Sequence, residues 1–372
     1  MKGATDMEQN SNLERLDAQL LQLFTERMKQ TPERKDPDED RKVLLHAART
    51  VPAEMRQYAI SLYSLLLDLG RSYQERDLSE TSDLTGQIRQ ALESTEQLFP
   101  ESASVACQGV AGAYSQMACE RLFRLPNILY CSTFDAVFSA VGSGLCRYGV
   151  VPLENSTAGS VNAVYDLMTR HNFRIVRSVR VKVDHCLLVN PGTKLSDIKE
   201  IYSHAQAISQ STEFLASLPG VKVIPYENTA VAAKMVAESG RKDVAALSSR
   251  ACRDLYGLEC LKESVQNQGN NFTRFICIAK DLEIYPGADR TSLMVVLSHE
   301  PGSLYKILSR FYALGINLNK LESRPLPDRN FEFMFYFDLE TSVYSPEFQQ
   351  LMGEMPRLCE RFTYLGSYHE IL

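Results

Sequence analysis

The residues best suited to chemistry lie in "NNFTRF" (residues 270–275), where polar side chains precede an apolar run. Thr273 and Arg274 stand in front of the apolar segment 275–279, which predicts a strand entering a sheet. A hydroxyl and a guanidinium at the mouth of a strand can hydrogen-bond an anionic ligand. Taken alone, the pattern favours a polar loop with its arginine in solvent. Evidence from the rest of the chain is needed to decide between such a loop and an anion-binding site.

Residues 104–281 alternate strand-like and helix-like segments, and this βαβα order predicts an α/β domain with a mainly parallel sheet. In such sheets ligands bind at the carboxyl ends of the strands and at the N-termini of the helices that follow. Polar clusters occur where this rule places a site, at residues 112–115, 154–157, 203–206, 227–229 and 273–274. Together, the five clusters are stronger evidence for a ligand site than any single cluster.

The flanking segments predict two further domains and a linker. Residues 1–78 have apolar residues at helical spacing, and they predict a capping box at Ser11 and Glu14, a short helix over 41–49 and a long helix capped by Thr50. Residues 79–103 are polar and acidic and predict a linker that is in part helical. Residues 290–372 predict the βαββαβ order of a ferredoxin-like domain.

The composition argues against several classes of protein. Of the 372 residues, 44% are hydrophobic and 23% charged, as in ordinary soluble proteins. The net charge of -6 gives no basic field for nucleic acid, and no apolar run approaches the roughly 20 residues that cross a bilayer. The N-terminus lacks the apolar core of a signal peptide. The nine cysteines form no CxxC pair and the six histidines lack ligand spacing, so we expect reduced thiols, no metal site and a cytoplasmic location.

Residues 104–281 resemble prephenate dehydratase. The resemblance rests on motifs in the family's order: "GVAGAYSQMA" (109–118), "VVPLENSTAGSV" (150–161), "VDHCLLV" (183–189), "SHAQAISQ" (203–210) and "NNFTRF". Residues 290–372 resemble an ACT domain, a regulatory module that binds amino acids, through "PGSL" (301–304) and "LESRP" (321–325). Residues 1–78 are similar, much more weakly, to the helical chorismate mutase domain of the bifunctional enzymes.

The resemblance implies a two-lobed α/β domain of the periplasmic-binding-protein type with its site between the lobes. It implies the conversion of prephenate to phenylpyruvate, water and carbon dioxide on the route to phenylalanine, without a cofactor or metal. Hydroxide is a poor leaving group, so a donor must protonate or strongly hydrogen-bond the ring hydroxyl while the ring carboxylate leaves as carbon dioxide. The enzyme therefore has to orient the substrate and stabilise the departing oxygen.

The resemblance also assigns site residues. Thr273 matches the family's essential threonine and is expected to hydrogen-bond the leaving oxygen or a carboxylate. Either Glu154 or Glu227 is the general acid if burial raises its pKa. Arg274 is expected to pair with a substrate carboxylate or to form a structural ion pair. Further expected site residues are Asn155, Phe275, Ser203, Gln210 and the turn Gly112, Ala113, Tyr114 and Ser115, whose backbone N–H groups suit a carboxylate. We favour structural roles for His185 and His204.

In the C-terminal region the resemblance implies that L-phenylalanine binds at a dimer interface and lowers activity. Gly302 would let the backbone approach the effector closely, and Asn317 is a reasonable contact for its head group. The full expected effector set is Gly302, Ser303, Leu304, Asn317, Glu322, Ser323, Arg324 and Pro325. Effector binding would shift the population towards a less active arrangement.

The N-terminal region departs from the mutase pattern. Arg27 matches a carboxylate-binding arginine and Gln74 the glutamine at the ether oxygen. Another expected arginine falls on Asn10, and the segment that would carry the key lysine is missing. Nothing in the spacing supports Lys29 or Lys35 as its replacement. We therefore expect a degenerate mutase domain retained for dimerisation, and a homodimer or homotetramer.

Three alternatives to a prephenate dehydratase stay open. The first is a fully bifunctional mutase–dehydratase that also uses chorismate. The second is a dehydratase that prefers arogenate, and the third is a non-catalytic sensor of amino acids. No residue decides between prephenate and arogenate. The intact motifs Thr273-Arg274-Phe275 and Glu154-Asn155 argue against the sensor, because a binding module does not need them.

Overall fold

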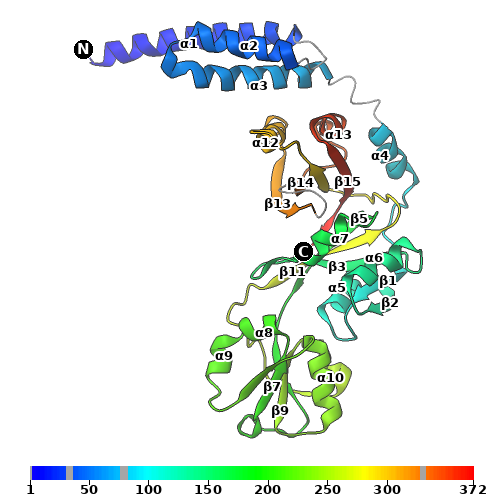
Figure 1. The fold of residues 1–372 in the computed structure, drawn as a ribbon. Coiled ribbons are helices and arrows are strands. Elements are labelled where there is room, and N and C mark those ends of the chain that lie inside the picture. The colour runs from blue at the N-terminus through cyan, green and yellow to red at the C-terminus, as the bar shows by residue number, and fades with distance from the viewer. Residues whose placement is uncertain (1, 31–36, 76–82, 327–331) are drawn as a thin grey trace. The chain divides into compact units, whose positions relative to one another are not determined.

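The computed structural model describes residues 2–30, 37–75, 83–326 and 332–372 (Figure 1), with side chains described for residues 12–30, 38–74, 83–326 and 332–372. The chain divides into two compact units. The first combines Met1–Gln87, Leu297–Ile316 and Tyr344–Phe362, and the second combines Ile88–Val296, Asn317–Val343 and Thr363–Leu372. The C-terminal region thus contributes helices to one unit and strands to the other.

The first unit is helical. Its elements are α1 (Lys2–Lys29), α2 (Pro37–Thr50), the 3-10 turn η1 (Ala53–Met55), α3 (Arg56–Glu75), α12 (Ser303–Ala313) and α13 (Pro346–Leu358). The predicted capping box is wrong, because α1 begins at Lys2 and Ser11 lies inside it. The predicted cap at Thr50 is also wrong: Thr50 ends α2, and its hydroxyl donates to the His46 carbonyl oxygen at 2.8 Å.

A buried ion pair joins α12 and α13 within this unit. Arg310 Nε lies 3.1 Å from Glu354 Oε2, and both side chains are almost fully buried. The other carboxylate oxygen, Oε1, accepts from the Ser72 hydroxyl of α3 at 2.5 Å and from Gln350 Nε2 at 2.8 Å. A buried charge is tolerated only when it is paired and hydrogen-bonded in this way.

The second unit contains a first lobe built on a seven-stranded sheet. Its strands are β1 (Ser102–Gln108), β2 (Leu125–Cys131), β3 (Tyr148–Asn155), β4 (Gly159–Ser160), β5 (Arg174–Lys182), β11 (Phe272–Ala279) and β16 (Glu370–Ile371). The order is β16-β5-β11-β3-β1-β2, with β4 on β3. β1 runs parallel to β2 and β3, whereas β11 runs antiparallel to β3 and β5. The expected mainly parallel sheet is therefore mixed.

Alternating side chains of this sheet bury both of its faces, as strand geometry requires. One face packs on α5 (Tyr114–Leu122) through Cys119 and Leu122. The opposite face packs on α6 (Phe134–Gly142) and α7 (Asn162–Met168) through Phe138 and Tyr165. Met334 and Tyr336 of the C-terminal strands join the second of these cores.

A second lobe follows in the same unit, with the sheet order β10-β6-β9-β7-β8. Its elements are β6 (Cys186–Val189), η3 (Leu195–Asp197), β7 (Glu200–Ser203), α8 (Ala205–Ser209), α9 (Thr212–Ala216), β8 (Lys222–Pro225), α10 (Thr229–Ser239), β9 (Val244–Ser248), α11 (Ala251–Tyr256) and β10 (Glu259–Lys262). The alanine-rich α10 covers one face and residues of α9 cover the other (Figure 1). The chain crosses between the lobes from β5 to β6 and returns from β10 to β11, so the expected two-lobed arrangement is present.

The last sheet has the order β13-β14-β12-β15. Its strands are β12 (Arg290–Val296), β13 (Asn317–Pro325), β14 (Phe333–Glu340) and β15 (Arg361–Tyr368). With α12 and α13 between them, they follow in the predicted βαββαβ order. The helix α4 (Asp83–Ser94) agrees with the expectation that residues 79–103 are in part helical. One feature differs from the expectation: β16 leaves this sheet to pair in parallel with β5 of the first lobe.

Candidate active site

A pocket of about 520 Å³ lies between the two lobes of the second unit. The first lobe contributes Tyr114, Asn155 and Thr273, and the second contributes His204, Glu227 and Thr229. All six of these residues belong to the polar clusters found in the sequence. Because β11 runs antiparallel to β3, its N-terminal Thr273 meets the C-terminal end of β3. The strand reversal therefore completes the site.

Asn155 and Thr273 line the pocket as a hydrogen-bonded pair. They are register partners on β3 and β11, and Asn155 Nδ2 donates to Thr273 Oγ1 at 2.9 Å. Thr273 is half-buried and lines the pocket. Because its oxygen accepts from Asn155 and no described protein group accepts its proton, the hydroxyl can donate to a bound molecule.

Asn155 also fixes the loop that follows β3. Its Oδ1 accepts from the Thr157 N–H at 3.1 Å, the Thr157 hydroxyl at 2.8 Å and the Ala158 N–H at 2.9 Å. Its Nδ2 reaches Asn271 Oδ1 at 2.8 Å as well. One buried amide therefore orients both the loop and the threonine.

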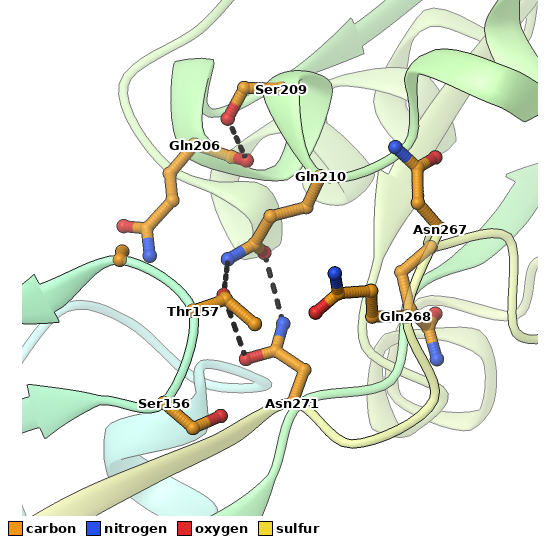
Figure 2. A pocket seen from close by; sticks show the side chains of 10 residues that line it. Ser156, Thr157, Gln206, Ser209, Gln210, Asn267, Gln268 and Asn271 are labelled. Atoms are coloured by element: carbon orange, nitrogen blue, oxygen red, sulfur yellow. Dashed lines mark hydrogen bonds between the residues drawn. The ribbon is translucent and has the colours of Figure 1, made fainter.

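Amide and hydroxyl groups bridge the lobes beside the pocket (Figure 2). Gln210 Nε2 donates to Thr157 Oγ1 at 2.8 Å, and Asn271 Nδ2 donates to Gln210 Oε1 at 3.1 Å. Thr157, Gln210 and Asn271 line a neighbouring pocket of about 480 Å³ (Figure 2), which shares Gln206, Gln210 and Ala158 with the active-site pocket. Gln210 was predicted as a site residue. Thr157 lay within a predicted cluster and Asn271 within the motif "NNFTRF", but neither was predicted as a site residue.

His185 and Tyr114 form the part of the pocket wall beside the crossing from β5 to β6. Tyr114 Oη donates to the Asp184 carbonyl oxygen at 2.7 Å and lies 3.3 Å from His185 Nδ1. His185 Nε2 lies 3.3 Å from Gln210 Oε1. Burial lowers the pKa of the His185 imidazole, although the hydrogen bond to Gln210 opposes this. His185 is therefore neutral at neutral pH and holds neighbours in place, whereas His204 accepts from the Gln206 N–H at the start of α8.

The pocket offers an anion neutral N–H donors in place of cationic side chains. No arginine or lysine is among the described residues that line it. Two helices of substantial length begin there, α5 after Ala113 and α10 after Asn228, whose side chain caps Val231 N–H at 2.8 Å. N-terminal N–H groups and the helix dipole favour negative charge.

Three predicted contacts lie away from the pocket lining. Ser203 is fully buried and donates to the Leu247 carbonyl oxygen at 2.7 Å, and Phe275 is buried in the first lobe's core. Gly112 shapes the turn before α5 at φ +87°, where an added Cβ would stand 2.6 Å from Cys252 Sγ. These residues support the site, while Ala113, Tyr114 and Ser115 line it.

Glu154 and Arg274 also lie outside the lining and contact the C-terminal strands. Glu154 Oε2 lies 2.9 Å from Lys320 Nζ, and Arg274 pairs with Asp338 and Glu370. Burial opposes ionisation of Glu154, but the hydrogen bond and charge of Lys320 and the charge of Arg274 outweigh it and lower its pKa. A lowered pKa is the opposite of what a general acid needs. The arginine takes the structural ion pair, which was the second expectation.

Two of the expected effector residues are engaged with the first lobe. Arg324 Nε and Nη2 donate to Asp166 of α7 at 2.9 and 3.0 Å, and Glu322 accepts from the Ser160 hydroxyl. Asn317 Nδ2 donates to Glu340 Oε2 at 3.0 Å. Ser323 and Pro325 also lie on β13, while Gly302, at φ +89°, precedes Ser303 and Leu304 at the start of α12. Their roles towards an effector stay a prediction.

The expected mutase remnant has a structural use in the first unit. Gln74 Nε2 donates to the carbonyl oxygens of Met28 at 2.8 Å and Lys29 at 3.0 Å, at the C-terminus of α1. Arg27 is half-buried in the last turn of the same helix. Lys35 and the side chain of Asn10 lie outside the described residues. Within the described ranges, no helix is long and apolar enough to span a membrane, and no three His, Cys, Asp or Glu side chains cluster as metal ligands.

Comparison with known proteins identifies the family. A family model described as prephenate dehydratase matches residues 105–283. Arogenate dehydratase/prephenate dehydratase 1 of Arabidopsis thaliana is 38% identical over 281 residues, which cover 71% of each chain. The bifunctional chorismate mutase/prephenate dehydratase of Escherichia coli is 35% identical over 275 residues, 72% of this chain and 71% of that protein. A solved prephenate dehydratase from Arthrobacter aurescens in complex with L-Phe has a TM-score of 0.66 at 27% identity and covers 72% of this chain and 89% of its own. The chain belongs to the prephenate dehydratase family.

Proposed function

We propose that the protein is a prephenate dehydratase, which converts prephenate to phenylpyruvate, water and carbon dioxide in phenylalanine biosynthesis. The observation that carries the proposal is the Asn155–Thr273 hydrogen bond in a pocket between two lobes. It leaves the Thr273 proton directed at a ligand. A hydroxyl donor at the departing oxygen supplies what this reaction needs.

The reaction can be followed atom by atom. The C–O bond of the ring hydroxyl breaks, and the departing oxygen takes a proton to leave as water. The bond between the ring and its carboxylate also breaks, and the carboxylate leaves as carbon dioxide. The electron pair of that bond enters the ring and makes it aromatic. Thr273 hydrogen-bonds the departing oxygen, and Asn155 holds the threonine oxygen in place.

Of the two expected acids, Glu227 rather than Glu154 stays the candidate proton donor for the departing oxygen, but its side chain is exposed, so the burial expected of a general acid is not present. Glu227 lines the pocket, whereas Glu154 is ionised in its contacts with Lys320 and Arg274. The two substrate carboxylates are assigned to the starts of α5 and α10, because no described lining residue carries a permanent positive charge.

A comparison of substrates tests the proposal. The purified protein is incubated with prephenate and, separately, with arogenate, and the products phenylpyruvate and phenylalanine are measured. We expect turnover with prephenate at the higher kcat/KM. Faster turnover of arogenate would make the protein an arogenate dehydratase, and no turnover of either would leave an amino-acid sensor.

The C-terminal strands, with α12 and α13, are assigned to an ACT domain that binds L-phenylalanine and lowers activity. The βαββαβ order and the sheet order β13-β14-β12-β15 support the assignment. So does the L-Phe bound to the relative from Arthrobacter aurescens. Addition of L-phenylalanine should lower the rate with prephenate, and Gly302→Val should weaken this inhibition without lowering the basal rate.

The helices α1–α3 are assigned to a degenerate mutase domain without mutase activity. Gln74 supports this, because its side-chain amide is used to cap α1 instead of facing a substrate. Phenylpyruvate should form from prephenate but not from chorismate. Formation from both substrates would make the protein bifunctional, like the relative from Escherichia coli.

We also infer a cytoplasmic homodimer. Leu20, Leu21 and Leu23 of α1 are each more than 60% exposed, which is unusual for leucines in one helix turn and favours a partner helix. Solution mass measurement of the wild type and of Leu20→Glu/Leu23→Glu tests it. A dimer that the double variant dissociates is expected, and a monomeric wild type would contradict the inference.

A further inference from the structure

Two pairs of residues, one strand position apart, face opposite sides of the first lobe's sheet. Asn155 is in register with Thr273, and Glu154 is in register with Arg274, on the antiparallel strands β3 and β11. Successive side chains of a strand point to opposite faces. The first pair lines the pocket, whereas the second pair contacts the C-terminal strands.

Beside a longer contact of 3.5 Å between its Nη1 and Glu154 Oε1, Arg274 is held mainly by residues from the C-terminal part of the chain. Its Nη1 bonds Asp338 of β14, its Nη2 donates to Tyr368 Oη at 3.0 Å, and its Nε lies 2.7 Å from Glu370 Oε1. The Arg274 and Asp338 side chains are only 7% and 1% exposed. A guanidinium so deeply buried is stable only while its anionic partners stay in place. The position of Arg274 therefore depends on β14, β15 and β16.

Lys320 of β13 forms a second connection. Its Nζ lies 2.9 Å from Glu154 Oε2 and donates to the Ser160 hydroxyl at 2.8 Å. Ser160 lies on β4 and lines the pocket, and its register partner on β3 is Glu154. The same C-terminal sheet thus reaches residues on both strands that carry Asn155 and Thr273.

We propose that Arg274, Glu154, Lys320 and Asp338, the rear cluster, are positioning residues that hold Thr273 and Asn155 in their working geometry from behind the sheet. The rear cluster makes the turnover number depend on the C-terminal strands without touching the substrate. Small displacements of a reacting group are costly, since about 1 Å can lower a rate roughly 100-fold. The inference rests on the proposed dehydratase function and replaces the expected contact between Arg274 and a substrate carboxylate.

A neighbouring ion pair provides a matched control. Arg324 of β13 donates to both oxygens of Asp166 on α7, at 2.9 and 3.0 Å. This pair also joins the C-terminal sheet to the first lobe, but Asp166 neither lines the pocket nor adjoins Asn155 or Thr273 in the sheet. Loss of this pair should therefore leave the site intact.

The test compares Asp338→Asn, Arg274→Gln, the double variant and Asp166→Asn. For each, kcat and KM for prephenate and unfolding in urea are measured on the full chain. We expect Asp338→Asn to lower kcat about tenfold or more, with KM within about twofold. The double variant should be no worse than Arg274→Gln alone, because the two residues act as a unit. Asp166→Asn should keep the wild-type kcat and KM.

Several outcomes separate the possibilities. Full kcat in Asp338→Asn would overturn the inference, as would a large rise in KM confined to Arg274→Gln, which marks a substrate ligand. If Asp338→Asn does not fold, Lys320→Met takes its place, because Lys320 is only half-buried. This variant is expected to show the same fall in kcat. A wild type without turnover would refute the proposed function itself, and the rear cluster would lose its role with it.

Discussion

The side-chain amide of Asn155 donates to the hydroxyl of Thr273 across 2.9 Å, between two strands that come from segments more than 100 residues apart. This contact sets the direction of the threonine proton. It also explains why a polar pair stands at the entrance of a buried strand, because Thr273 faces the pocket while Arg274 faces the C-terminal strands.

Asn155→Asp tests this contact. A carboxylate cannot donate to Thr273, and it adds negative charge where a dianionic substrate binds, so kcat should fall and KM for prephenate should rise. Because Asn271 and Thr273 then lose their donor, the free energy of unfolding should fall by about 1–3 kcal/mol. Steady-state kinetics and urea titration measure both effects. Unchanged kinetics would mean that Thr273 is oriented by other groups.

Gly366 is predicted to be the least replaceable glycine of the second unit. It lies in β15 at φ +144°, where an added Cβ would stand 2.2 Å from the Ile175 carbonyl oxygen. Gly366→Ala should lower the free energy of unfolding by more than about 3 kcal/mol, because backbone and not a flexible side chain blocks the methyl group. Gly287→Ala is the control: at φ +84° with nothing within 4 Å, it should cost only the backbone strain of about 1–2 kcal/mol. Equal losses would show that the close approach in β15 is absent.

The Arg310–Glu354 pair is predicted to hold the first unit together. Glu354→Ala leaves the Arg310 guanidinium buried without its carboxylate, which should destabilise the protein by about 3–5 kcal/mol. Gln349→Ala, at an exposed position of the same helix, should change stability by less than about 0.5 kcal/mol. Thermal or urea unfolding measures both losses of stability. A loss of less than about 1 kcal/mol in Glu354→Ala would mean that water reaches this ion pair.

Acid should destabilise the protein in part through His185. Its folded pKa is below the ordinary value of 6.5, chiefly because the imidazole is buried. The unfolded chain therefore binds this proton at a higher pH than the folded chain, and stability falls as the pH drops below about 6.5. His185→Asn removes this contribution, so its free energy of unfolding should fall less than that of the wild type between pH 7.5 and pH 5.5. Parallel losses would mean that the imidazole is hydrated.

Local pattern was sufficient for most elements of residues 104–281 and 290–372. Alternation predicted strands such as β14, and apolar spacing predicted helices such as α12. Pattern failed at helix starts in the N-terminal region. Residues 4–10 contain neither proline nor glycine, and Gly3 lies only one position after the start of the helix, so the helix extends past a possible cap to Lys2.

Strand direction and long-range polar contacts were beyond the sequence. The pattern of residues 272–279 does not indicate that β11 runs antiparallel to β3. This strand direction makes the sheet mixed instead of mainly parallel. The partners of Arg274, among them Asp338 and Glu370, lie 64 or more positions away, so no local spacing points to them. Residue type alone left the arginine between a substrate contact and a structural ion pair.

The most direct test of the central claim is the rate of phenylpyruvate release from prephenate by Thr273→Ala and Thr273→Ser beside the wild type. Loss of the hydroxyl donor should lower kcat of Thr273→Ala by about 10²–10³-fold, while Thr273→Ser, which keeps the hydroxyl, retains most of the activity. Both variants should unfold at nearly the wild-type urea concentration. A Thr273→Ala variant that turns over prephenate at the wild-type rate would contradict the account, because the site would then work without the group at its centre.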